Sequence, residues 1–330
     1  MKKLSLVLLA SLGVQYGYCA TTNYDYQALV NQAYSKFSSD NSGNVANYIP
    51  ELAKYNPKLF AITLITVDGK VYSAGDVKSA FPLESLSKVF TLAMALNQSG
   101  AQDYEDKIGS NATGLPFNSV TAVEQQPNHI GNGLVNAGAI ATVSYINASN
   151  KEDKWDKIYG NLNNYAGTKL TFNKPVYDSE MATNQHNEGI AMLLQSYDSF
   201  YDKSPADDVD VYTRECSVDA TTLDLAKMAI PFANHGKSPF TNKQLIDSKL
   251  VQYVLAEMTS AGMYDNSGNW LYETGVPAKS GVGGGMFAIV PGKYVIAAYS
   301  PRLDKNGNSI RSQEAIKYIV NATNGNMFNQ

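Results

Sequence analysis

The sequence is poor in the residues that form disulfide frameworks and metal sites. It has two cysteines and three histidines among 330 residues. Cys19 lies in an N-terminal segment treated below, which leaves Cys216 without a partner for an intramolecular disulfide. We interpret Cys216 as a small buried hydrophobic residue. No carboxylate or cysteine cluster with metal-site spacing accompanies His129 or His186, so neither a metal nor another cofactor is expected.

The chain also has few charged residues and no long block of either sign. Charged residues make up 17% of the sequence, and the formal net charge is −4. No basic stripe or acidic tail is present. This composition argues against nucleic acid or a membrane surface as a partner.

One apolar run stands apart, at the N-terminus. Lys2 and Lys3 precede the apolar residues 4–14, and small residues follow at Gly17, Cys19 and Ala20. The run is too short for a membrane span and is typical of a secretory signal, which we place at residues 1–20. We therefore expect a periplasmic or secreted protein. If the segment is not cleaved, the protein is expected to stay cytoplasmic.

Two β-hairpins are predicted, one near each end of the chain. Residues 60–67 and 71–74 flank Asp68-Gly69, and residues 285–290 and 294–299 flank Pro291-Gly292. Runs rich in β-branched and aromatic residues on either side of a turn dipeptide are the signature of paired antiparallel strands. Both hairpins are expected to belong to one antiparallel sheet.

Helical periodicity dominates the rest of the sequence. The apolar spacing predicts helices over residues 24–39, 85–96 and 313–320. It also predicts a helix that begins near residue 44 and is interrupted at Pro50 and Pro57. Residues 100–237 are helical and loop-rich with no clear hairpin. The expected fold class is α+β, with an antiparallel sheet built from N- and C-terminal segments (about 21–84 and 240–330), flanked by helices, and an inserted all-α lobe at about 100–237. A site is expected between the two lobes.

The first candidate for chemistry is Ser85-Leu86-Ser87-Lys88. Ser85 and Lys88 are three residues apart at the start of a predicted helix, so their side chains share a face. A serine hydroxyl becomes a nucleophile when a neighbouring base removes its proton, and a lysine acts as that base when it is neutral. Burial and a second cation, for which Lys279 is the candidate, both favour neutral Lys88. On this motif alone, Ser85 could equally be a helix cap.

The second candidate is Lys279-Ser280-Gly281, which precedes further glycines at 283, 284 and 285. Ser-x-x-Lys followed far downstream by Lys-Ser-Gly is the order seen in penicillin-recognising serine enzymes. The glycines would let a substrate approach the backbone closely. Tyr145-Ile146-Asn147 lies where the third motif of those enzymes is expected. A β-lactamase or transpeptidase therefore remains an alternative at this point.

The stretches around these motifs resemble the serine-dependent glutaminase family from about residue 44 to residue 309. The resemblance rests on eight blocks in the same order as in the family: residues 47–52, 85–90, 135–140, 179–180 (Ser-Glu), Asn187, Tyr212 with Cys216-Ser217, 262–265 (Gly-Met-Tyr-Asp) and 277–282 (Pro-Ala-Lys-Ser-Gly-Val). Two departures are visible. Residues 128–134 lack the Asn-Pro that members usually carry there, and His186 stands where an arginine is common.

The resemblance implies a single catalytic domain over residues 21–330 with a β-lactamase-like fold, which hydrolyses glutamine to glutamate and ammonia without a cofactor. It implies the following roles: Ser85 as nucleophile, Lys88 as base, the backbone N–H groups of Ser85 and Val282 as oxyanion donors, Tyr264 as proton relay, Asn136, Glu180, Asn187 and Tyr212 as the clamp for the free amino-acid end, and Tyr48 as a further site tyrosine. Family members usually form dimers or tetramers, so a homodimer or homotetramer is expected.

The clamp is chemically reasonable for a zwitterionic substrate. Glu180 would supply an anion for the α-ammonium group, and the amides of Asn136 and Asn187 with the Tyr212 hydroxyl would donate to the α-carboxylate. Taken singly, each of these residues could instead be a turn cap, a core residue or a solvated charge. A non-catalytic glutamine-binding module would keep the clamp but would not need Ser85 beside Lys88.

Overall fold

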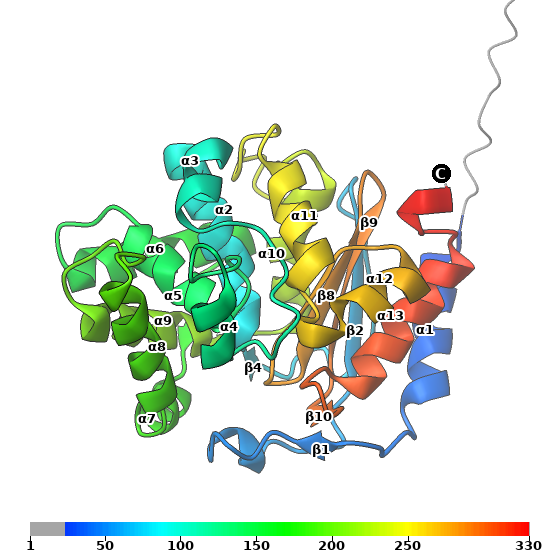
Figure 1. The fold of residues 1–330 in the computed structure, drawn as a ribbon. Helices are drawn as coiled ribbons and strands as arrows, with labels where there is room; N and C mark the ends of the chain where they lie inside the picture. The colour runs from blue at the N-terminus through cyan, green and yellow to red at the C-terminus, as the bar shows by residue number, and fades with distance from the viewer. Residues whose placement is uncertain (1–23, 330) are drawn as a thin grey trace, which may run out of the picture.

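The computed structural model describes residues 24–329, so the predicted signal segment at 1–20 lies outside the described residues. A five-stranded antiparallel sheet forms the centre of one half of the molecule, in the order β3-β2-β9-β8-β7 (Figure 1). Its strands are β2 (Ala61–Thr66), β3 (Val71–Gly75), β7 (Ala278–Ser280), β8 (Gly285–Val290) and β9 (Tyr294–Tyr299). Both predicted hairpins are confirmed. They join through β2 and β9, with Ala61 opposite Tyr299, so segments far apart in sequence meet in the middle of the sheet.

Helices cover both faces of this sheet. On one face, Ile62, Leu64 and Ile296 pack with α1 (Tyr26–Phe37) and α13 (Ile310–Ala322). On the other face, Ile65 and Val295 pack with α10 (Thr222–Ala233). Successive side chains of a strand point to opposite faces, so a strand buried on both sides reads as a continuous apolar run. Residues 61–66 and 285–290 are accordingly buried throughout.

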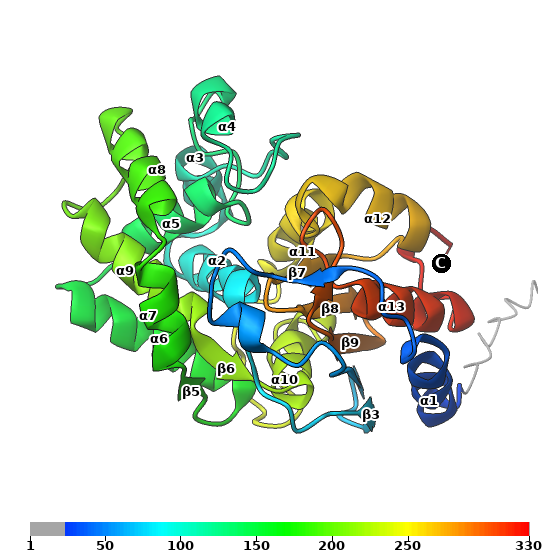
Figure 2. The same cartoon turned by 90° about the horizontal axis from the view of Figure 1, so that it is seen from below.

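The second half of the molecule is a group of helices around α2 (Ser87–Ser99), which lies between this group and the sheet (Figures 1 and 2). Residues of α2 are buried on nearly all sides, as expected for a central helix. The other helices of this group are α3 (Ala101–Lys107), α4 (Val120–Gln125), α5 (Asn136–Tyr145), α6 (Lys151–Ala166), α7 (Lys174–Met181), α8 (Gln185–Ser196) and α9 (Pro205–Cys216). Two further helices, α11 (Val251–Ala261) and α12 (Ser267–Thr274), pack on each other, and α12 also packs on α13. The predicted α+β class, with an antiparallel sheet and a helical insertion, is confirmed.

Two local predictions differ from the structure. The helix predicted from about residue 44 is wrong, because Asn44–Val45 forms strand β1 paired with β10 (Arg302–Leu303), and only a short 3-10 turn, η1 (Leu52–Lys54), follows. Pro50 and Pro57 are incompatible with a continuous helix there. A small sheet in the order β4-β6-β5 was not predicted; its strands are β4 (Phe81–Pro82), β5 (Thr171–Phe172) and β6 (Val218–Ala220). Strands this short show no alternation.

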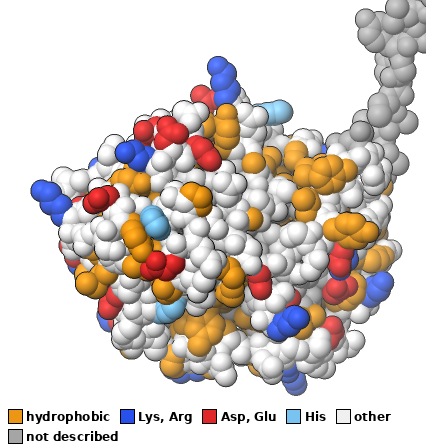
Figure 3. All heavy atoms as spheres, viewed as in Figure 1, with side chains coloured by type: hydrophobic (Ala, Val, Ile, Leu, Met, Phe, Trp, Pro, Cys, Tyr) orange, Lys and Arg blue, Asp and Glu red, His pale blue; other side chains and the backbone are white. Residues whose placement is uncertain are grey.

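The surface agrees with the low charge of the sequence. On the face seen in Figure 3, basic and acidic side chains are interspersed, and apolar side chains are scattered among them. Within residues 24–329, no helix is both long enough and apolar enough to cross a bilayer.

Candidate active site

Ser85 lies in a tight turn that leads directly into the central helix. The predicted helix over 85–96 is present, but its first turn is the 3-10 segment η2 (Glu84–Leu86), and α2 begins at Ser87. Glu84 has a φ of +49°, a region that non-glycine residues seldom adopt. The backbone N–H groups that begin such a turn have no intrahelical acceptor. Strain of this kind persists where the surrounding structure holds it, often at functional sites.

A cavity of about 130 Å³ opens beside Ser85. Pockets for drug-sized ligands have volumes of about 300 to 1,000 Å³, so the smaller volume of this cavity suits a small metabolite. The cavity brings together seven of the predicted site residues: Tyr48, Ser85, Asn136, Glu180, Asn187, Tyr212 and Val282. Tyr48 is 55% exposed, which places it at the edge of the cavity. The remaining lining residues are Ile49, Glu84, Phe117, Asn118, Thr183, His186 and Cys216.

Lys88 lies one turn along from Ser85 and is buried. Its Nζ donates a hydrogen bond to Oδ1 of Asn136 at 2.6 Å. Burial lowers the pKa of Lys88 to about 8, although the acidic groups of Cys216, Glu215, Glu84 and Glu180 oppose the shift. A lysine with this pKa is partly neutral near physiological pH, which is the form that can take a proton from a hydroxyl.

Lys279, on β7, is also fully buried and packs against Tyr264. Its Nζ donates to the carbonyl oxygen of Ser280 at 2.7 Å and lies 4.5 Å from the centre of the Tyr264 ring. Burial and then the charge of Lys88 hold the pKa of Lys279 well below its usual value. Lys279 therefore loses its proton readily, so burial, rather than a cationic Lys279, is the main cause of the lowered Lys88 pKa.

Tyr264 lies between Ser85 and β7, at the start of the 3-10 turn η3 (Tyr264–Asn266). Its hydroxyl donates to the carbonyl oxygen of Ser280 at 3.0 Å. Burial raises the pKa of Tyr264, so its phenol keeps its proton. Its φ of +58° is a second strained backbone position next to the serine.

The glycine-rich segment after Lys279 packs against the turn that carries Ser85. A Cβ atom at Gly281 would lie 2.8 Å from the carbonyl oxygen of Leu83, and one at Gly283 would lie 3.0 Å from that of Pro82. The sequence interpretation that these glycines admit substrate is therefore wrong for these two positions. They admit the backbone of the Ser85 turn, which places Val282 at the cavity. Among residues 24–329, the N–H groups of Ser85 and Val282 donate to no backbone carbonyl.

Asn136, the first residue of α5, connects Lys88 with Asn187 and Tyr212 of the predicted clamp. Its Oδ1 accepts hydrogen bonds from Lys88 and, at 3.3 Å, from the Tyr212 hydroxyl. Its Nδ2 donates to Oδ1 of Asn187 at 3.0 Å. The Lys88 Nζ also lies 5.6 Å from the centre of the Tyr212 ring. Residues from α2, α5, α8 and α9 are thus held in one polar network.

Known proteins are similar to this chain in sequence and in fold. A family model described as Glutaminase matches residues 43–328. A curated glutaminase of Colwellia psychrerythraea is 52% identical over 306 residues, which cover 92% of this chain and 97% of the relative. Glutaminase 1 of Escherichia coli K12 is 47% identical over 303 residues, with coverage of 92% and 97%. The chain belongs to the glutaminase family.

Solved structures of this kind share the fold. A probable glutaminase, ybaS, matches with a TM-score of 0.89 at 46% identity, over 92% of this chain and 97% of that one. Mglu in its glutamate form matches with a TM-score of 0.85 at 33% identity, over 92% of this chain and 70% of that one. The resemblance drawn from the sequence motifs is confirmed, and the chain is a glutaminase enzyme.

Of the other residues considered from the sequence, Tyr145, Asn147 and His129 lie outside the cavity of this glutaminase, and His186 lies at it. Tyr145 and Asn147, which supported a penicillin-recognising enzyme, do not line it. The hydroxyl of Tyr145, the last residue of α5, donates to Asp103 on α3. His129 stacks on Tyr197 with ring centres 3.7 Å apart. His186 lies at the cavity, where its Nε2 is 2.6 Å from the carbonyl oxygen of Asn118.

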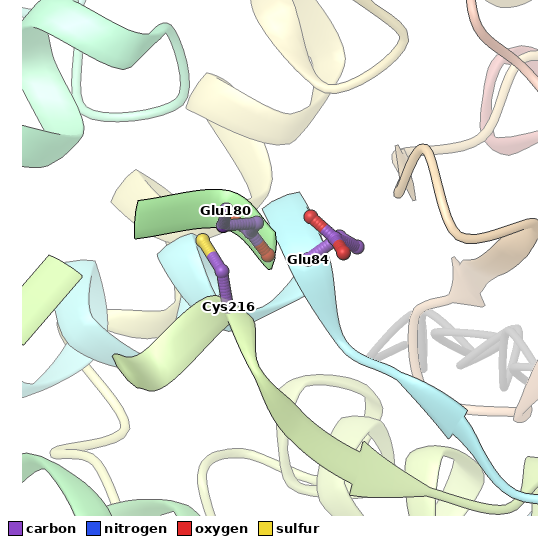
Figure 4. A group of neighbouring side chains, drawn as sticks. All are labelled: Glu84, Glu180 and Cys216. Atoms are coloured by element: carbon purple, nitrogen blue, oxygen red, sulfur yellow. The ribbon is translucent and has the colours of Figure 1, made fainter. Parts of the chain in front are cut away.

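Two residues that sequence reasoning missed belong to the site of this glutaminase. Glu84 and Cys216 line the cavity beside Glu180, and one ligand atom from each of the three lies within 4.8 Å of the others (Figure 4). Cys216 is buried, as predicted, but it is not only a packing residue. Glu84 directly precedes the candidate nucleophile, which is the one signal that could have drawn attention to it.

Proposed function

We propose that this glutaminase hydrolyses the side-chain amide of L-glutamine through an acyl-enzyme on Ser85, with Lys88 as the base. Family membership supports the overall reaction, glutamine to glutamate. The observation that carries the mechanism is the position of Lys88, which is buried one turn from a serine at the cavity and has a pKa of about 8. This arrangement pairs a nucleophile with a base that is partly neutral at working pH.

In the first half-reaction, Ser85 Oγ attacks the side-chain carbonyl carbon of glutamine while its proton passes to Lys88 Nζ. The negative charge that forms on the carbonyl oxygen is accepted by the backbone N–H groups of Ser85 and Val282. The bond from carbon to nitrogen then breaks, and the leaving amide nitrogen takes a proton from the Tyr264 hydroxyl. Ammonia departs and a γ-glutamyl ester remains on Ser85.

In the second half-reaction, a water molecule attacks the ester carbon and loses its proton to the Tyr264 phenolate, which becomes a phenol again. The same two N–H groups stabilise the second oxyanion. The bond to Ser85 Oγ breaks, the serine recovers its proton from Lys88, and glutamate leaves. Lys88 and Tyr264 are then both back in their starting protonation states.

The polar lining of the cavity supports a free amino acid as substrate. Glu180 offers an anion for the α-ammonium group, and the Asn136 and Asn187 amides with the Tyr212 hydroxyl surround a space suited to the α-carboxylate. Mglu, which shares this fold, has been solved in a glutamate form. A β-lactam or a peptide has no such zwitterion to satisfy these groups.

The proposal is tested with protein purified from residues 21–330. We expect ammonia release from L-glutamine, no hydrolysis of a chromogenic cephalosporin, and a γ-glutamyl adduct on the peptide that contains Ser85 after rapid acid quenching and mass spectrometry. An adduct on another residue would overturn the assignment of Ser85. Cephalosporin hydrolysis without ammonia release would overturn the choice of glutamine.

Glu180→Gln is expected to weaken substrate binding far more than turnover. Removing one member of a buried charge pair costs about 2 to 5 kcal/mol, so KM for glutamine should rise roughly 30-fold to 4,000-fold while kcat changes much less. Steady-state ammonia release measures both constants. Asp178→Asn is the matched control, because Asp178 lies on the same helix, exposed and paired with Lys174. An unchanged KM in Glu180→Gln would remove Glu180 from the clamp.

We also propose that residues 1–20 direct export. The charged start, the short apolar run and the small residues after it support this assignment. Expression of the full chain in a Gram-negative host, followed by fractionation, should place a shortened protein in the periplasm. Full-length protein in the cytoplasm would contradict the proposal. The homodimer or homotetramer expected from the family resemblance stays a prediction.

A further inference from the structure

Two carboxyl groups meet at one wall of the cavity. Glu84, from η2, and Glu180, from α7, both line the cavity and lie close to each other and to the Cys216 sulfur at the end of α9 (Figure 4). Glu84 is 3% exposed, and Oε1 of Glu84 and of Glu180 are both buried without a hydrogen-bond partner within residues 24–329. Buried carboxyl oxygens without partners are costly unless a ligand or a proton satisfies them.

The environment of the pair contains too little positive charge for two carboxylates. The titratable groups that face Glu84 and Glu180 are Lys88 on α2, Cys216 and Tyr212 on α9, Asp219 on β6 and the phenols of Tyr48, Tyr55 and Tyr264. Lys88 is the one cation among them, and it is held by Asn136. Two carboxylates this close in a buried setting share a proton, as in other carboxyl pairs.

The direction of each titration agrees with this arrangement. Burial, then the charge of Glu180 and a hydrogen bond to it, raises the pKa of Glu84 well above its usual value. Burial raises the pKa of Glu180 to about 7, while the hydrogen bond from Glu84 opposes the rise. Both shifts favour the neutral form, so one proton is shared by the pair.

We propose that Glu84 is a second carboxyl group of the α-ammonium site, and that the proton which the empty Glu84–Glu180 pair shares is released to solvent when L-glutamine binds. This inference rests on the proposed function, because it places the α-ammonium group of glutamine at this wall. The ammonium brings one positive charge and three N–H donors to two carboxyl groups with unpartnered oxygens. Its charge takes over the role of the shared proton, so the carboxyl groups ionise together.

An organic ammonium fits this wall better than a metal ion does. Burial and the negative charges of Glu180 and Glu84 raise the pKa of the Cys216 thiol well above its usual value, so Cys216 stays protonated. Metals bind the thiolate form of cysteine. A neutral thiol leaves two carboxylates as the only charged groups of the cluster, and hydrogen bonds to them can hold an ammonium group.

The proposal is tested by counting protons with the Ser85→Ala protein, which holds glutamine without turnover. Titration calorimetry at pH 7 in phosphate and in Tris separates binding heat from buffer ionisation. We expect release of about half to one proton per glutamine, and a glutamine Kd that falls with rising pH by up to about tenfold per pH unit for each proton released. Glutaramate, which lacks the α-ammonium group, should bind without proton release.

The decisive variant is Glu84→Gln in the Ser85→Ala background. The amide keeps the shape of Glu84 and can donate to Glu180, but it removes the shared proton, so proton release should fall close to zero. Glu257→Gln is the matched control: Glu257 is a buried glutamate away from the cavity, its pKa is raised by burial to about 8, and it accepts from the Gly133 N–H at 2.9 Å. This control should release as many protons as Ser85→Ala alone.

Each outcome has a separate meaning. No binding of glutamine by Ser85→Ala, together with no ammonia from the intact enzyme, would overturn the proposed function. Tight binding without proton release, or with a Kd that does not change between pH 6 and 8, would overturn the present inference alone. Undiminished proton release in Glu84→Gln, or release with glutaramate, would do the same. The pH dependence of Kd needs no change at Glu84, so the inference stays open to refutation even if that variant does not fold.

Discussion

Ser85→Ala is expected to lose ammonia release by a factor on the order of 10⁴ or more in kcat, because it removes the hydroxyl that lines the cavity one turn from Lys88. Alanine removes one oxygen from a residue in the turn η2 and leaves the turn's backbone hydrogen bonds in place. Glutamine binding should therefore persist, and calorimetry with this variant should give a Kd close to the KM of the intact enzyme. Thermal unfolding should change little.

The matched control is Ser87→Ala, two residues further along. The Ser87 hydroxyl is buried, donates to the carbonyl oxygen of Glu84 at 2.8 Å and does not line the cavity. Its loss removes one hydrogen bond, worth about 1 kcal/mol of stability, and should leave kcat within about tenfold. If Ser85→Ala kept more than about a hundredth of the activity, Ser85 would not be the nucleophile.

Lys88→Arg should lower kcat/KM by about 10²-fold to 10⁴-fold, the usual contribution of a general base. Arginine keeps a positive charge and can still donate to Asn136, but it does not lose its proton in proteins. The pH profile gives a second measurement. Because neutral Lys88 is the active form, kcat/KM of the intact enzyme should rise with pH through about 8, the pKa of Lys88, and then level off.

Lys154→Arg provides the control for a change at a buried lysine. Lys154 is buried on α6, away from the cavity, and forms ion pairs with Asp202 and Asp208. Its replacement can lower the unfolding temperature but should leave the rise of kcat/KM near pH 8 unchanged. A Lys88→Arg enzyme that kept both its rate and this rise would show that another group acts as the base.

Much of the fold could be predicted because its signals are local. The hairpins around Asp68-Gly69 and Pro291-Gly292 combine a turn dipeptide with β-branched flanks, and the helices α1 and α13 have clear apolar stripes. The strands of β4, β5 and β6 could not be predicted, because two or three residues carry no periodic signal. Asn44–Val45 is a strand only because Arg302–Leu303 lies beside it.

The candidate site divides in the same way. The motifs around Ser85, Lys88 and Lys279 pointed to the residues for which we propose catalytic roles, because their types and order are themselves the signal. Glu84 carries no motif of its own, and Cys216 stood in a family block without a role at the site; the meaning of both depends on η2 and the end of α9 meeting Glu180 across the cavity. The glycines at 281 and 283 were expected from the sequence to admit substrate, and only the fold shows that they admit the backbone of the Ser85 turn.

By itself, then, the sequence determined the family, the fold class and which side chains are able to react, since these depend on residue types and short-range spacing. The tertiary structure alone decided the electrostatics. The pKa of Lys88 near 8, the more easily neutralised Lys279 and the carboxyl pair of Glu84 and Glu180 all arise from burial among groups that are distant in sequence. Desolvation and charge proximity act through space, so only the folded chain sets them.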